Sequence, residues 1–153
     1  RNHPLSEMTM AFPARSLIGL ALSAALLVSA HAAPLRADHP LLGTWKLALP
    51  DGSCSEVYHF RPDGTGLVTS AQEVAETTFT ISYQPSARGF YLLTDTLVRD
   101  NGKPDCAGNI TPVGQKASHH VVFHHSGQMF LMCQDEDMEA CMGPFVSEDG
   151  VPV

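Results

Sequence analysis

Four of the eight histidines of this chain lie within seven residues, in the stretch His119-His120-Val121-Val122-Phe123-His124-His125. Imidazole is a common metal ligand, so this stretch raises the question of a metal site. Successive side chains of a β-strand point to opposite faces, at a rise of about 3.3 Å per residue. His119 and His125 would share one face about 20 Å apart, and His120 and His124 the other about 13 Å apart. Since ligand nitrogens lie about 2 Å from a bound zinc, no two same-face histidines of this strand can chelate one ion.

The only metal candidates that this geometry leaves are cross-strand pairs. A tight turn at Ser126-Gly127 predicts a hairpin in which His120 faces Cys133 and His124 faces Met129. Soft sulfur ligands would suit copper, but a Cys133 in a disulfide could not serve as a ligand. We therefore predict no metal site and no cofactor, and we keep His120, His124 and Met129 as weak metal candidates. The more apolar face of the hairpin should be the core, and it carries Val121, Phe123, Phe130 and Met132.

The other reactive residue types do not form a pattern typical of an enzyme. The chain has no Gly-x-Ser-x-Gly motif, and its acidic segment 134–139 lacks the central glycine of a calcium-binding loop. Residues 33–153 carry seven Lys and Arg against fifteen Asp and Glu, which disfavours nucleic acid and anionic membranes as partners. We predict a protein that is not an enzyme.

Four cysteines predict two disulfides, because an even number in an exported chain is typical of a disulfide framework. Three connectivities are open. We favour Cys133–Cys141, which closes a short acidic loop, together with Cys54–Cys106 as a long-range bridge. The paired spacing of a zinc site, such as Cys-x2-Cys, is absent from the sequence.

The N-terminal residues have the features of a secretory signal peptide. Arg15 supplies a positive charge, residues 16–30 are apolar and uncharged, and Ala30-His31-Ala32 is a small-x-small cleavage site. The apolar run is shorter than the roughly 20 residues of a membrane-spanning helix, so we predict no membrane span. We expect residues 1–32 to be upstream residues and signal peptide, and the protein to be exported to a bacterial periplasm or the extracellular space.

Beyond residue 40 the chain consists of short segments of alternating polarity separated by turn residues, such as Arg61-Pro62-Asp63-Gly64. Strands are predicted at residues 42–49, 55–61, 66–74, 76–84, 90–99, 118–125, 128–133 and 140–147. About eight strands joined mostly by hairpins predict an all-β, antiparallel up-and-down meander closed into a small barrel, because closure removes unpaired edges. The barrel domain should span residues 41–148, after an N-terminal arm at 33–40 and before a tail at 149–153.

Two motifs lie near the start of this domain, Leu41-Leu42-Gly43-Thr44-Trp45-Lys46 and Phe60-Arg61-Pro62-Asp63-Gly64-Thr65-Gly66. The first resembles the Gly-x-Trp start of calycin-type barrels, the lipocalin-like proteins, and the second resembles the F-x-x-DGTG hairpin of bacterial lipocalin-like domains. The resemblance implies a lipocalin-like barrel with Trp45 plugging its closed end, and a small apolar ligand in its interior. The interior residues that would bind the ligand are Trp45, Tyr58, Phe60, Phe79, Ile81, Phe123, Phe130 and Met132.

Gly43, Trp45 and Cys54 also resemble the start of calycin-type periplasmic inhibitors of secreted metalloproteases. Those inhibitors act through an extended N-terminal arm, which would be residues 33–40 here. The alternative function is therefore a protease inhibitor, or another protein-binding module, that acts through this arm. The expected partner is a small apolar molecule or a protein, and the sequence leaves the oligomeric state open.

Overall fold

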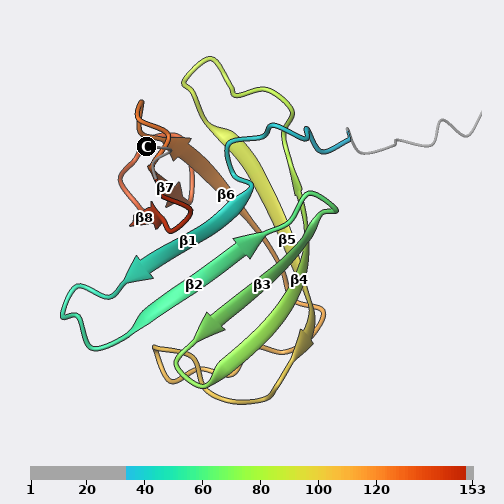
Figure 1. Ribbon diagram of the computed structural model, residues 1–153, viewed down its shortest axis with the longest axis vertical. Helices are drawn as coiled ribbons and strands as arrows, with labels where there is room; N and C mark the ends of the chain where they lie inside the picture. The colour runs from blue at the N-terminus through green and yellow to red at the C-terminus, as the bar shows by residue number, and fades with distance from the viewer. Residues whose placement is uncertain (1–33, 151–153) are drawn as a thin grey trace, which may run out of the picture. The chain divides into compact units, whose positions relative to one another are not determined.

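The computed structural model describes residues 34–150, and it confirms an all-β fold in which eight antiparallel strands close into a barrel (Figure 1). Each strand pairs with the next along the chain, and the last pairs with the first. The strands are β1 (Gly43–Ala48), β2 (Ser55–Phe60), β3 (Thr65–Ser70), β4 (Glu73–Ile81), β5 (Tyr91–Asp100), β6 (Lys116–Phe123), β7 (Met129–Cys133) and β8 (Cys141–Ser147). The predicted signal peptide at 1–32 lies outside the described residues.

The predicted strands agree with the observed ones to within about two residues, except around β3 and β4. The prediction of one strand over residues 66–74 is wrong, because the chain turns at Ala71 and Gln72 and β4 begins at Glu73. Ala71 has a φ of +53°, a conformation usually taken by glycine or asparagine. Neither Ala71 nor Gln72 is a typical turn residue, so the sequence does not predict this turn. The turn at Arg61-Pro62-Asp63-Gly64 is confirmed, with Gly64 at a φ of +82°.

The hairpin of β6 and β7 has the predicted register. His120 lies opposite Cys133, Val122 opposite Leu131, and Phe123 opposite Phe130. The predicted core face is also confirmed for Val121, Phe130 and Met132, which are buried, while Phe123 packs against the core and is partly buried.

Aromatic side chains form much of the buried core of the barrel. Phe130 is 1% exposed, stacks on Phe145 with ring centroids 4.5 Å apart, and meets Trp45 edge-on at 4.8 Å. The Trp45 indole N–H donates to the carbonyl of Leu41 at 2.8 Å, so the indole has its polar partner although it is buried. The buried cluster is composed of Leu41, Trp45, Leu47, Phe60, Phe79, Ile81, Leu93, Val121, Phe130, Met132 and Phe145.

The segment before β1 closes this end of the barrel. Leu35 packs against the core, and Leu41 is fully buried. His39 is also buried; its Nδ1 accepts the Leu41 N–H at 3.1 Å, and its Nε2 donates to the carbonyl of Ser82 at 3.2 Å. Burial lowers the pKa of His39, so the neutral imidazole that this bonding requires is the favoured form.

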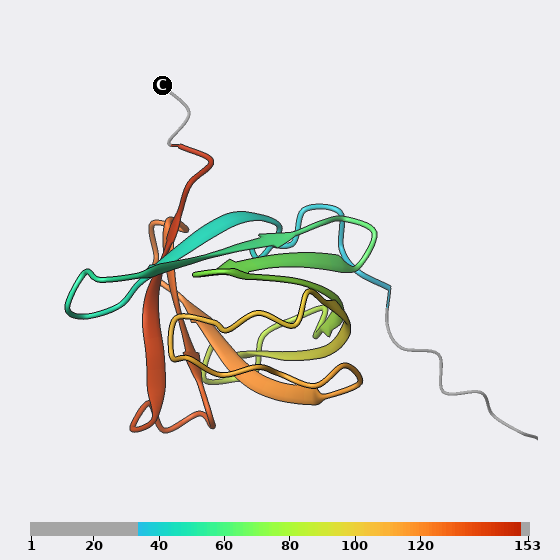
Figure 2. The same cartoon turned by 90° about the horizontal axis from the view of Figure 1, so that it is seen from below.

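Two disulfides join the pairs favoured from the sequence, Cys54–Cys106 and Cys133–Cys141. The long-range bridge attaches the loop of residues 101–115, here called the strap, to the start of β2. The strap connects β5 to β6 at the end of the barrel away from residues 34–42, and Figure 2 shows it crossing that end. Residues 34–150 contain no helix that is long and apolar enough to cross a membrane.

Candidate functional site

The barrel holds a partly open cavity of about 220 Å³ beside the aromatic core. Its walls come from β2 to β6 and from the strap. The lining is polar and acidic, and it consists of Glu56, Tyr58, Val68, Ser70, Glu73, Ala75, Thr77, Asp95, Leu97, Asp105, Thr111, Gln115, Ala117 and His119. Four of these residues are carboxylic acids, and none is a lysine or an arginine.

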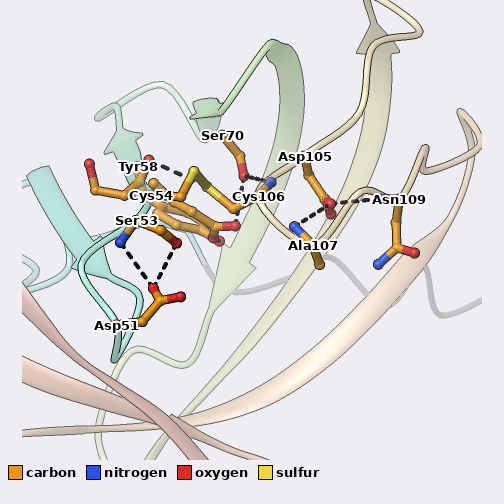
Figure 3. Close-up of a disulfide and its surroundings, with 11 residues drawn as sticks. Asp51, Ser53, Cys54, Tyr58, Ser70, Asp105, Cys106, Ala107 and Asn109 are labelled. Atoms are coloured by element: carbon orange, nitrogen blue, oxygen red, sulfur yellow. Dashed lines mark hydrogen bonds between the residues drawn. A yellow bond between two sulfur atoms is a disulfide. The ribbon is translucent and has the colours of Figure 1, made fainter.

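Two hydroxyl groups hold the carboxylate of Glu56 at one wall of the cavity. Tyr58 donates to Oε2 at 2.6 Å, and Ser70 donates to Oε1 at 2.7 Å. Ser70 Oγ also accepts the backbone N–H of Cys106 at 2.9 Å, as Figure 3 shows. Burial and then the charge of Glu56 raise the pKa of Tyr58, which keeps the phenol protonated and able to donate. This wall is therefore bonded directly to the strap.

A second wall carries two carboxyl groups that lie close together without a cation. Glu73 is 7% exposed, and burial, followed by the neighbouring Asp100 carboxyl and the charges of Asp105 and Glu56, raises the pKa of Glu73 from 4.5 to about 7. Asp100 Oδ1 accepts the Gly102 N–H at 2.6 Å, whereas Oδ2 is buried with no hydrogen-bond partner among residues 34–150. Such a site favours either a retained proton or a bound cation.

Asp95 adjoins the aromatic core in register, because it lies opposite Phe79 on β4. It is partly buried, and burial raises the pKa of Asp95, while the charge of His119 opposes that rise. His119 also lines the cavity, from β6. It is the one lining side chain whose protonation would add a positive charge.

The geometry can hold a small molecule that carries positive charge. A cavity of about 220 Å³ has room for several waters, or for a compound of similar size. An ammonium about 4 Å from a carboxylate is stabilised by roughly 4 kcal/mol at an effective dielectric constant of 20.

Most of the interior residues predicted to bind a ligand lie in the aromatic core and not in the cavity wall. Tyr58 is the one member of the predicted set that lines this cavity. Phe123 is partly buried beside the core. The others are buried in mutual contact, namely Trp45, Phe60, Phe79, Ile81, Phe130 and Met132.

The weak metal candidates lie away from the cavity. Cys133, opposite His120, is in a disulfide, and His120 Nδ1 lies 3.9 Å from Glu136 Oε1. His124 Nδ1 pairs with the Ser126 hydroxyl at 2.8 Å. Within residues 34–150 no group of three or more His, Cys, Asp or Glu side chains has the arrangement to hold a metal ion.

The described part of the predicted N-terminal arm lies against the barrel. Arg36 donates from Nη1 to the carbonyl of Tyr83 at 3.0 Å, and its guanidinium holds the pKa of Asp38 below the usual range. Together with the contacts of Leu35 and His39, these bonds make residues 35–40 part of the closed end.

The acidic residues of the cavity were not among the predicted site residues, although local patterns contain them. Asp95 alternates with Leu93 and Leu97, which puts a carboxyl on an otherwise apolar inward face. Glu56 shares its face with Tyr58 in the same way. Glu73 could not be found by this signal, because the turn that starts its strand was not recognised.

No protein-family model, curated protein or solved structure matches the chain. The assignment of a function therefore depends on the residues of the cavity itself.

Proposed function

We propose that this protein is an exported, non-enzymatic binding protein of the lipocalin-like type, whose cavity takes a small molecule bearing an ammonium group. The closed antiparallel barrel and the burial of Trp45 at one end support the lipocalin-like part of this proposal. Two disulfides support an exported location, because such bonds persist in oxidising compartments.

One observation carries the ligand class. The space inside the barrel is lined by Glu56, Glu73, Asp95 and Asp105, with no lysine or arginine to neutralise them. An apolar ligand, as expected from the sequence, would have to displace the packed side chains of the core or bind in a separate apolar hollow of about 400 Å³ at the β6–β7 hairpin, which includes Phe123 and Phe130. The positive charge of a cationic ligand would instead pair with these carboxylates, whose burial without a partner costs free energy.

The inhibitor alternative gains no comparable support. It would require residues 33–40 to extend into a protease, whereas His39 is buried and Arg36 is bonded to the barrel. Release of these residues would uncover the end of the aromatic core.

Calorimetry with a matched pair of compounds tests the ligand class. Choline and 3,3-dimethylbutan-1-ol have nearly the same shape, but only choline carries a positive charge. We expect choline to bind at pH 8 with a Kd of about 1 mM or tighter, and the neutral alcohol to bind at least tenfold more weakly. Asp95→Asn should weaken choline binding at least tenfold, while Glu76→Gln, on the outer face of the barrel, should not. Equal binding of the two compounds would refute the cationic ligand and favour the apolar one.

A further inference from the structure

The strap is attached to the barrel at three places. At its start, Asn101 Nδ2 donates to the carbonyl of Gln72 at 2.8 Å. In its middle, Cys106 is bonded to Cys54, and its N–H donates to Ser70 Oγ. At its end, the Gly114 N–H donates to the carbonyl of Leu97 at 2.7 Å.

Between the second and third attachments, the hydrogen bonds of the strap are all internal to it. Within the described residues, every hydrogen bond of residues 107–113 stays inside the strap, and the carboxylate of Asp105 accepts two of them, from the N–H groups of Ala107 and Asn109 (Figure 3). Ile110 is 60% exposed and Val113 is 59% exposed, so the segment buries little apolar surface. Segments with few buried contacts and no bonds to their surroundings are those that open at low free-energy cost.

The same segment forms part of the cavity wall. Thr111 lines the cavity, and so do Asp105 and Gln115, which flank the segment. A displacement of residues 107–113 would therefore widen the cavity at Thr111 and increase the access of solvent to the carboxyl groups that line it, without requiring any strand of the barrel to separate.

We propose that residues 107–113 are a movable wall of the cavity, and that the Cys54–Cys106 bridge is the clamp that limits how far this wall opens. The bridge acts at the residue next to Asp105, and through Ser70 it also reaches the carboxylate of Glu56. Loss of the bridge would leave the span from Asn101 to Gly114 held in its middle by the hydrogen bond from the Cys106 N–H to Ser70 Oγ. The role of this wall in ligand entry rests on the proposed function, whereas its movement does not.

Chemical labelling of carboxyl groups tests this movement without any ligand. A water-soluble carbodiimide with glycine ethyl ester, followed by peptide mass spectrometry, gives the labelling rate of each carboxyl. In the Cys54→Ser/Cys106→Ser variant we expect Glu73 to be labelled about tenfold faster than in the native protein, because one anchor of the wall is lost. Glu76, on the outer face of the same strand, should change less than twofold. The matched variant Cys133→Ser/Cys141→Ser should leave the labelling of Glu73 unchanged.

A second variant keeps both bridges and weakens another anchor. Asn101→Ala removes the bond to Gln72, and we expect it to speed the labelling of Glu73 by a smaller factor of about three. Hydrogen exchange of β4 and β5 shows whether each variant keeps its barrel. If the double variant loses protection throughout β4 and β5, Asn101→Ala decides the outcome. Unchanged labelling of Glu73 in the variants that keep their barrels overturns the movable wall. If Glu73 is labelled faster in the variants but the native protein fails to bind choline, the proposed ligand class is overturned and the movable wall is retained.

Discussion

Replacement of Glu73 by glutamine should stabilise the protein at neutral and alkaline pH. The side chain is 7% exposed and lies beside Asp100, with no lysine or arginine in the cavity wall. Its pKa rises on folding from 4.5 to about 7, which corresponds to roughly 3 kcal/mol. Glutamine has nearly the same shape and stays neutral, so it removes this cost.

The sign of the effect follows from where the proton is bound. Well below pH 4.5, Glu73 is protonated in the folded and unfolded states alike, and its charge does not affect stability. Between pH 4.5 and about 7 the unfolded chain releases the proton first, so the free energy of unfolding falls as pH rises. Above about pH 7 the full cost is present. Glu73→Gln should therefore match the native protein at pH 4 and exceed it by roughly 3 kcal/mol at pH 8.

Urea unfolding followed by the fluorescence of Trp45, with both disulfides oxidised, measures this difference. At pH 8 the variant should also melt roughly 10 °C higher than the native protein. Glu76→Gln is the matched control, because Glu76 lies on the same strand with its side chain 44% exposed. Its only ion pair within residues 34–150 is a solvent-exposed one with Arg99 at 3.5 Å, so the change should alter stability by less than about 0.5 kcal/mol. A Glu73→Gln protein no more stable than the native one at pH 8, or equally stabilised at pH 4, would show that the buried carboxyl does not carry this cost.

Two further predictions concern the closed end of the barrel. Phe130→Ala should lower the free energy of unfolding by about 3–5 kcal/mol, because Phe130 packs on Trp45 and Phe145. The control Val146→Ala, on the outer face, should lower it much less. Equal losses in urea unfolding would contradict this packing. The ring protons of His39 should titrate by NMR with a midpoint below pH 6.5. The contribution of its neutral ring to stability should be lost as pH falls below 6.5. A midpoint at or above that value would contradict its burial.

The sequence alone determined the features that depend on neighbouring residues. Alternating polarity and turn residues located most strands, and the Ser126-Gly127 turn set the register of the β6–β7 hairpin. These features were predictable because side-chain direction in a strand and the geometry of a tight turn are local properties. The turn at Ala71 was not, since alanine at positive φ is imposed by the pairing of β3 with β4 and not by its own preference.

The contents of the barrel interior depend on tertiary packing. Inward-facing residues could be proposed from alternation, but closure determined that Phe130 and its neighbours pack into one buried cluster. The pairing of β4 with β5 brought Glu73 beside Asp100, and the strap lies across the opposite end of the barrel. The pKa of a carboxyl depends on burial and on charges from strands distant in sequence, so the acidic character of the cavity arises only when those strands are assembled.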